Sequence, residues 1–340
     1  MLMKKIIHYM TLFVILLFTN CLTASCIKDD YTATDGTSTI NLYFSTRSDE
    51  ADTGDTQETT IPVGTNEGIK TLRVFITDEN GKVQCNIYQD YSNDSQGNNA
   101  VKTFTIMGVP VGTKNFYVIA NEASVGLTKN DLDNRQMVDE DFLNTVITNP
   151  SSPSVAYFPR MRNQINELGL PITGMRTDVL VEGEKQDLEI PITHAVAKIV
   201  FKVKNTSSED ITLTGFSLGE FFADQTYLFP SATGQLTGVN YAPFGGTVNH
   251  TFTAGAAEAE YFTCYLYETP EDRKSYFTVK LLSDLGLEEK PVTISDYVVK
   301  RNTVINIVAT ISKETSVIVP KIDWQVSPWN PETNDVPSFN

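Results

Sequence analysis

The chain has 340 residues, of which 41% are hydrophobic and 20% are charged, and its formal net charge is −16 with a pI near 4.6. This balance supports packed cores and excludes both a wholly disordered chain and a polytopic membrane protein. The length exceeds the usual size of one core, so we expect two domains. The acidic charge and the lack of a basic patch exclude nucleic acid as an expected partner, because binding phosphates needs clustered Lys and Arg.

The N-terminus has the pattern of an export signal. Lys4 and Lys5 precede an apolar run over residues 6–18, which is too short for a spanning helix and typical of a secretory leader. We expect residues 1–25 to be a cleaved signal peptide. The stretch Leu22-Thr23-Ala24-Ser25-Cys26 resembles a bacterial lipobox, which predicts acylation of Cys26, although Thr23 departs from the usual Leu or Val and Cys21 is a weaker second candidate.

The residues after Cys26 resemble a sorting signal. Lys28-Asp29-Asp30 is similar to the Lys-acidic-acidic signal that sends lipoproteins to the outer face of the outer membrane in some Gram-negative anaerobes. This resemblance predicts a lipid-anchored, surface-exposed precursor in the cell outer membrane.

Two cysteines remain in the body of the chain. Cys85 and Cys264 lie far apart in sequence, so they form neither a zinc-ligand cluster nor a Cys-x-x-Cys motif. Two separate thiols are the simpler interpretation, and a disulfide stays open because an exported protein permits one.

Short alternating apolar runs between turn residues predict antiparallel strands in the first half. Residues 39–46 place Ile40, Leu42 and Phe44 on one face, and Asn80-Gly81 predicts a hairpin turn between strands over 69–77 and 82–88. Further strands are expected over 101–107 and 114–120, and the rough helical spacing of apolar residues over 128–147 predicts one or two short helices against a sheet.

The second half repeats the strand pattern after a polar turn at residues 181–185, where we place the domain boundary. Strands are expected over 188–192, 197–204, 211–218, 248–252, 260–267, 276–282, 290–294 and 302–311. This spacing favours an all-β fold with two antiparallel β-sandwich domains, 48–183 and 184–315, the first with a short helical insertion.

Several weak motifs in a fixed order resemble the type V pilins, or fimbrillins, over most of the chain. They are the lipobox region, the hairpin from Ile69 to Gly81, the stretches 109–122, 170–175, 193–199 and 299–302, and a tail with Trp324 and Trp329. The resemblance implies transthyretin-like sandwiches, no enzymatic activity, no cofactor, and a role as a major structural subunit of an adhesive fimbrium.

The resemblance also implies a maturation step. Residues 26–47 would be a lipidated propeptide that carries the first strand with Ile40, Leu42 and Phe44, and an arginine-specific protease would cut between Arg47 and Ser48. Loss of that strand would leave a groove of unpaired backbone groups and exposed core.

The tail is the expected replacement for that strand. In residues 316–340, Ile322, Trp324 and Val326 alternate with Asp323 and Gln325, and Val317 and Val319 are expected to extend the apolar face. A tail that enters the groove of a neighbouring copy would give a head-to-tail homopolymer. The alternative is that both segments are ordinary terminal strands of their own sandwich.

Other functions have weaker support in the sequence. Gly215-Phe216-Ser217-Leu218-Gly219 matches a nucleophile elbow, but the helix that should follow Ser217 is missing, and with His8 in the leader only His194 and His250 remain, too few for a histidine metal centre. We therefore expect no catalytic and no metal site. A pilus anchor or tip subunit that keeps its lipid stays open, as does a surface glycan-binding lipoprotein; the adhesion receptor is not indicated.

Overall fold

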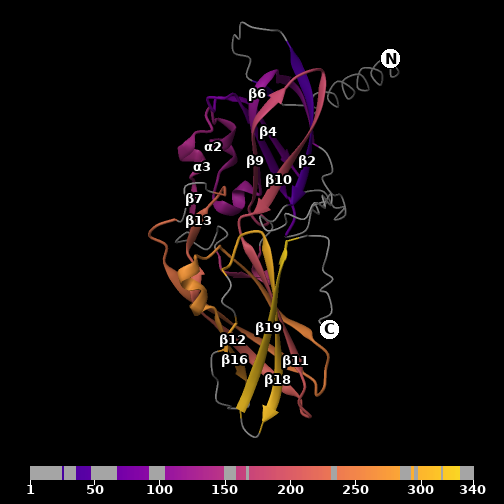
Figure 1. Cartoon of the computed structure of the whole chain (residues 1–340), viewed down its shortest axis with the longest axis vertical. Helices are drawn as coiled ribbons and strands as arrows, with labels where there is room; N and C mark the ends of the chain where they lie inside the picture. The colour runs from indigo at the N-terminus through magenta and orange to yellow at the C-terminus, as the bar shows by residue number, and fades with distance from the viewer. Residues whose placement is uncertain are drawn as a thin grey trace, which may run out of the picture.

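A computed structural model describes residues 25–26, 36–46, 67–91, 104–148, 158–165, 168–230, 236–283, 292–294, 298–314 and 317–329. These residues form a nearly all-β protein of two units stacked along the long axis, with the N-terminal unit above the C-terminal unit in Figure 1. The all-β fold class expected from the alternating pattern is confirmed.

The N-terminal unit is built on one eight-stranded sheet. Its strand order is β1-β4-β3-β6-β9-β10-β2-β5. The bounds are β1 Ser25–Cys26, β2 Thr37–Thr46, β3 Thr71–Thr77, β4 Val83–Asp90, β5 Phe104–Pro110, β6 Gly112–Ala120, β9 Ile172–Val181 and β10 Lys185–His194. The β3–β4 hairpin turns at Gly81, whose φ of 79° is the positive value that Asn-Gly turns supply.

The C-terminal unit packs two further sheets face to face. The first has the order β19-β18-β11-β15-β8 and the second the order β14-β12-β16-β17. The bounds are β8 Arg160–Met161, β11 Ala197–Asn205, β12 Ile211–Ala223, β14 Tyr241–Phe252, β15 Ala259–Leu266, β16 Thr278–Ser283, β17 Val292–Thr293, β18 Thr303–Glu314 and β19 Val317–Pro328. Short 3-10 turns occur at η2 Arg162–Gln164 and η3 Glu271–Tyr276.

Three groups of buried apolar side chains form the cores. One lies inside the curved N-terminal sheet and one lies between the two C-terminal sheets. The third lies under the helical insertion and continues to the junction of the units, where it includes Phe229, Tyr267 and Trp329. The two units are therefore joined by packed apolar surface as well as by chain connections.

The structure departs from the sequence-based expectation at two points. β10 pairs with β9 and β2, so the first sheet continues past the boundary expected at residue 184 and ends at His194. Two strand pairs are parallel, β10 with β2 and β11 with β18. Alternation within a strand gives its faces but not the direction of its neighbours, which explains why the parallel pairs escaped prediction.

The expected helical segment consists of short pieces that cover one face of the N-terminal sheet (Figure 1). They are η1 Glu122–Val125, α2 Lys129–Asp133 and α3 Glu140–Leu143, followed by β7 Val146–Thr148, which pairs with β13 Gln225–Tyr227. The Thr128 side chain caps α2 by accepting a hydrogen bond from the Asp131 N–H, and Asp139 caps α3 through Phe142.

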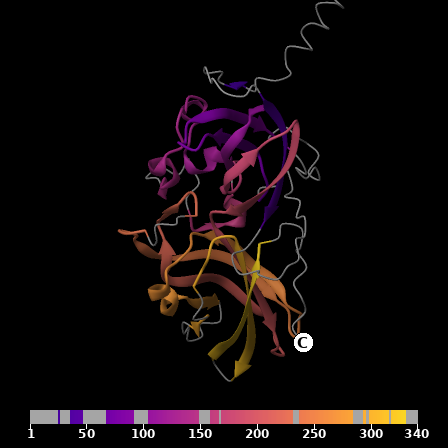
Figure 2. The same ribbon diagram turned by 45° about the horizontal axis from the view of Figure 1, so that its top comes forward.

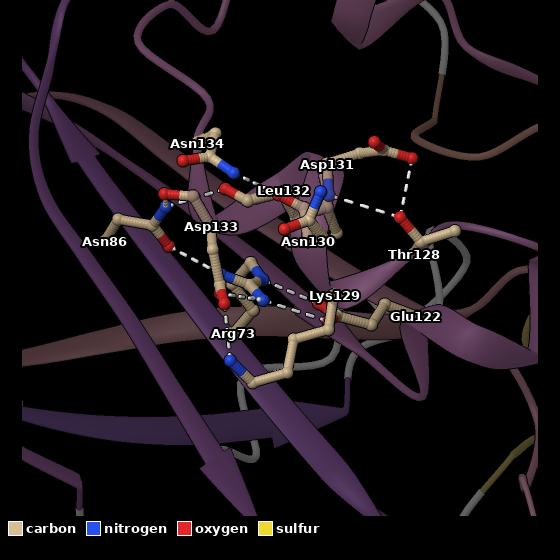
Figure 3. A network of polar contacts seen from close by, with 10 residues as sticks. All are labelled: Arg73, Asn86, Glu122, Thr128, Lys129, Asn130, Asp131, Leu132, Asp133 and Asn134. Atoms are coloured by element: carbon tan, nitrogen blue, oxygen red, sulfur yellow. Dashed lines mark hydrogen bonds and ion pairs between the residues drawn. The ribbon is translucent and has the colours of Figure 1, made fainter.

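One buried arginine fixes this insertion to the sheet (Figure 3). Arg73 of β3 is 1% exposed and donates to both carboxylate oxygens of Glu122, at 2.6 and 3.0 Å. It also donates to Asp133 at 2.9 Å and to Asn86 at 2.7 Å. Because Asp133 ends α2 and Glu122 begins η1, one guanidinium group holds both elements in place.

We expect the Arg73→Met variant to lose about 3–5 kcal/mol of unfolding free energy, because the Glu122 carboxylate stays buried without its cation. Lys129→Met is the matched control, since Lys129 pairs with the same Asp133 but is 54% exposed and should cost less than about 1 kcal/mol. Denaturant unfolding of both variants measures the difference. Equal losses would show that Arg73 has no special role in anchoring the insertion.

Candidate functional site

Strand β2 has a neighbouring strand on each side. β2 pairs in parallel with β10 from Thr39↔Lys185 to Thr46↔Ile192, and antiparallel with β5 from Thr37↔Pro110 to Leu42↔Phe104. Removing β2 would leave the backbone groups of two facing strands without partners. The resulting slot is called the groove below.

The inward side chains of β2 belong to the core. Ile40 and Leu42 are fully buried and Phe44 is 8% exposed, and all three pack in the same apolar group as Ile106 of β5 and Ile190 of β10. Burial of such side chains stabilises by roughly 1.5–3 kcal/mol each. The apolar face of this strand is therefore a core face, and its role as the filling of a groove stays a prediction.

The outward side of β2 carries a polar contact at its centre. Asn41 is 8% exposed; its Nδ2 donates to Asp187 of β10 at 2.7 Å, and its Oδ1 accepts from the Thr105 hydroxyl of β5 at 2.9 Å. Asn41 thus contacts both walls of the groove at one position. No pattern in the sequence marked it, because a single outward asparagine in a strand is common.

The C-terminal strand β19 is the edge strand of the five-stranded sheet in the other unit, beside β18 (Figures 1 and 2). β19 pairs antiparallel with β18 over its whole length, from Val317↔Glu314 to Pro328↔Thr303. Ile322 and Val326 are half-buried against the C-terminal core, and Trp324 is 39% exposed. The tail therefore buries its anchors less completely than β2 does.

The pairing of β19 with β18 is unbroken. Its register against β18 has no shift between residues 317 and 328. Positions 317 and 319 therefore alternate in phase with Lys321 and Asp323, not with Ile322, Trp324 and Val326. The role of Val317 and Val319 as part of the donor face stays a prediction.

The end of the tail is fixed at the junction of the two units. Trp329 is 2% exposed and stacks between His194, at 4.1 Å between ring centroids, and Tyr265, at 5.7 Å. Its backbone N–H donates to the Asn302 carbonyl at 3.0 Å, and the Lys198 ammonium lies 5.5 Å from its ring centroid. Trp329 holds β19 in its present position.

Glu67 joins the groups around this tryptophan. Its carboxylate accepts from Lys198 at 2.9 Å and from the Tyr265 hydroxyl, and it lies 3.6 Å from Arg162. Burial alone would raise the pKa of Glu67, but Lys198 and Tyr265 outweigh it and the pKa lies below the ordinary 4.5. Burial together with the neighbouring Glu67 carboxylate raises the pKa of Tyr265 well above its usual range.

His194 is a packing residue here, as its place beside an apolar strand predicted. It is fully buried, with Nδ1 3.2 Å from Asn302 Oδ1 and Nε2 3.3 Å from the Glu67 carbonyl oxygen. Burial lowers the pKa of His194 below its ordinary value of 6.5. The hydrogen bonds to the Glu67 carbonyl and Asn302 raise the pKa, but burial is the larger effect. The imidazole is therefore neutral at pH 7 and stacks flat on Trp329.

The other predicted site residues have different outcomes. Arg47 and Ser48 lie outside the described residues, so cleavage stays a prediction. The backbone of Cys26 pairs with Cys85 in β1–β4, which leaves its acylation untested. Cys85 and Cys264 are both buried free thiols, which agrees with the two-thiol interpretation.

The match to a nucleophile elbow at residues 215–219 is part of an ordinary strand. Ser217 lies inside β12, between the antiparallel strands β14 and β16, and not at a turn between a strand and a helix. Within the described part of the chain, no group of three or more His, Cys, Asp or Glu residues could hold a metal ion. No helix there is both long enough and apolar enough to cross a membrane.

Comparisons with known proteins support the family resemblance. Residues 37–155 match the family Major fimbrial subunit protein (FimA), which confirms the resemblance to the fimbrillins that the sequence motifs indicated. No curated protein sequence matches the chain.

Solved structures share the fold. A candidate cell adhesion protein from Bacteroides eggerthii aligns over 88% of this chain and 98% of its own, with 13% identity and a TM-score of 0.55. Another, from Parabacteroides distasonis, has the same coverage, 12% identity and a TM-score of 0.52. The tip fimbrial protein Mfa3 from Porphyromonas gingivalis, solved with a C-terminal truncation, aligns over 86% of this chain and 100% of its own, with 13% identity and a TM-score of 0.50.

Replacing Trp329 by alanine should release the end of the tail. The cavity costs about 3–5 kcal/mol of unfolding free energy, and limited proteolysis should cut β19 faster than in the parent chain. Trp324→Ala, at a side chain that is 39% exposed, is the matched control and should have the smaller effect on both measures. The opposite ranking would contradict the role of Trp329 as the anchor.

Stability should fall as the pH drops from 7.5 to 5.5. The pKa of His194 is lowered in the folded state, so the unfolded chain binds the proton more readily and folding loses stability below pH 6.5. Glu67 contributes its own loss only below its ordinary value of 4.5, outside this window. Denaturant unfolding at both pH values gives the loss of unfolding free energy on acidification. This loss should be smaller for His194→Phe than for the parent chain. The control His250→Phe, at an exposed position of β14, should lose as much as the parent.

Proposed function

We propose that this chain, which matches the major fimbrial subunit family over residues 37–155, is a structural subunit of an adhesive pilus, or fimbrium. It is exported as a lipoprotein through Cys26, cut after Arg47, and polymerised head to tail by donor-strand exchange. The observation that carries the proposal is β2: a strand paired on both sides and buried on its inward face, directly followed by an arginine.

Cleavage after Arg47 would turn β2 into a separate peptide. Its link to β3 would be lost, and only its ladder bonds and the burial of Ile40, Leu42 and Phe44 would hold it. A strand of similar pattern at high local concentration can then compete for the same backbone groups. Cleavage thus allows another strand to replace β2, which the intact chain connection prevents.

β19 is the segment with the right properties to compete. It has the alternating anchors Ile322, Trp324 and Val326, and at home it pairs with β18 at an edge of its sheet. In the groove the same side chains would be covered more completely. Full burial of an exposed apolar side chain stabilises by roughly 1.5–3 kcal/mol, and these partly buried anchors would gain the remaining part of that amount. Release of Trp329 from its pocket opposes this gain, so the buried tryptophan slows premature exchange.

β2 contains one unfavourable buried polar group that a donor strand could replace. The hydroxyl of Ser38 is buried, with no hydrogen-bond partner among the described residues. An unsatisfied buried polar group costs about 1–3 kcal/mol, and an apolar donor residue at this site would remove that cost. This term favours the exchanged state over the precursor.

The places of the two strands favour a filament over a closed ring. β2 lies in the upper unit and the β18–β19 hairpin extends at the lower end of the molecule (Figure 1). A donor at one end and an acceptor groove in the other unit give a head-to-tail contact that repeats. The expected partners are other copies of this subunit, an arginine-specific protease and, before cleavage, the outer membrane through the lipid.

Two variants test the proposal. A chain that ends at residue 315 should fold and be cleaved but form no filaments, because the donor is missing, and Arg47→Ala should stay uncut and monomeric because the groove is filled. Arg176→Ala, at an exposed position of β9, is the control for loss of an arginine away from the cleavage site. Electron microscopy after protease treatment, with mass measurement of the N-terminus, gives the readout.

The same measurements separate the related roles. Ser48 as the cell-derived N-terminus supports a processed stalk subunit, and acyl-Cys26 supports an anchor. Filaments formed by the chain that ends at residue 315 would refute the donor role of the tail. A chain that binds glycans and forms no polymer under any condition would instead be a surface glycan-binding lipoprotein.

A further inference from the structure

We propose that the outward face of the groove, through Lys185 and Asp187 of β10, sets the register in which the tail of a neighbouring copy enters. This inference rests on the proposed strand exchange. It assigns Trp324 to the site of Ile40 and Gln325 to the site of Asn41, with the donor in the same direction as β2.

The total apolar content of the inward residues does not choose the register. The groove has inward sites at positions 38, 40, 42 and 44, of which 38, 40 and 42 are 2% exposed or less in the precursor. If Ile322 replaced Ile40, these sites would take Pro320, Ile322, Trp324 and Val326. If Trp324 replaced Ile40, they would take Ile322, Trp324, Val326 and Pro328. Both alignments insert one proline, one isoleucine, one tryptophan and one valine, so the apolar inventory is the same.

The outward residues differ sharply between the two alignments. On β10, Lys185 lies opposite position 39 and Asp187 opposite position 41, and both side chains are exposed on the outward face. With Ile322 at position 40, Lys321 would face Lys185 and Asp323 would face Asp187. Like charges directly opposite each other destabilise a strand pair, and this alignment has two such pairs.

Shifting the donor by one inward site reverses both contacts. With Trp324 at position 40, Asp323 faces Lys185, which makes an opposite-charge pair. Gln325 then occupies the site of Asn41, which donates to Asp187 at 2.7 Å and accepts from Thr105 at 2.9 Å. The glutamine amide carries the same donor and acceptor as asparagine, so it can replace both bonds.

Other alignments meet one of these penalties again. Moving the donor so that Lys321 faces Asp187 places Asp323 opposite Glu189 and puts Pro320 at position 40, inside both ladders, where its missing N–H is costly. A reversed donor with Gln325 at position 41 also places Asp323 opposite Glu189. The register with Trp324 at position 40 is free of like-charge pairs and keeps prolines out of the doubly paired centre.

Reversing the charges at positions 323 and 185 tests the register, because the two alignments predict opposite changes in the rate of filament growth. Asp323→Lys alone and Lys185→Asp alone should each slow filament growth by about three- to tenfold, and the double variant should recover most of the rate. In the alignment with Ile322 at position 40 each single change would instead speed growth, because it would remove a like-charge pair. Glu220→Lys and Lys204→Asp, on exposed positions of β12 and β11, are the charge-matched controls, and thermal unfolding of each monomer checks that it folds.

Cross-linking then fixes direction and register together. Filaments of Asp323→Cys/Lys185→Cys and of Gln325→Cys/Asp187→Cys should both give intersubunit links with a short thiol reagent, whereas Asp323→Cys/Asp187→Cys should not. Cys85 and Cys264 are buried and Cys26 leaves with the propeptide, so background links are low. Links in the third pair, or in one of the first two alone, would overturn the register. A double charge variant whose filament growth rate does not recover would also overturn it. If the filaments still need the tail in these cases, strand exchange itself remains supported. Filaments that do not need the tail would refute the proposed function.

Discussion

The structure depends on one strand that is doubly paired and one-sidedly buried. β2 closes the ladder between β10 and β5 and places Ile40, Leu42 and Phe44 in the N-terminal core. Backbone groups that face each other across an empty strand position cannot be satisfied by side chains, so the sheet needs a strand there. It does not need this particular strand, because main-chain ladder bonds are independent of sequence. This difference between needing a strand and needing a given sequence makes exchange physically possible.

The tail is held in a different way. β19 has one strand neighbour and incompletely buried anchors, and its firmest contact is Trp329 between His194 and Tyr265. β19 is held by a ladder on one side and by Trp329 at its end, so its release requires Trp329 to leave its buried position. The groups around Trp329, Glu67 and Lys198 among them, also join the two units, so release of Trp329 would also loosen the junction. Mild acid should weaken both the packing of Trp329 and the junction, because burial disfavours the charged form of the His194 imidazole.

Polar contacts play a fixing role throughout this all-β chain. Arg73 ties the helical insertion to the sheet through Glu122 and Asp133, and Asn41 ties β2 to both neighbours. Arg301, which lies just before β18, pairs with Glu268 and donates to the Thr226 hydroxyl of β13. Apolar packing supplies most of the stability, but it permits several registers and orientations of similar energy. The buried and half-buried polar groups select among them, because each is satisfied in one arrangement.

The sequence by itself determined the strand pattern and its faces. The alternation of Ile40, Leu42 and Phe44, the Asn80-Gly81 turn and the two short helices were predictable because local periodicity and turn chemistry act over a few residues. The order of weak motifs also predicted the fimbrillin resemblance, which the match over residues 37–155 confirms. Only the tertiary structure decided which strands become neighbours. It placed β10 in the first sheet in parallel with β2, and it brought His194, Tyr265 and Trp329 together from three distant parts of the chain. These contacts are non-local: each depends on how far-separated strands fold back on one another, and no local pattern encodes that.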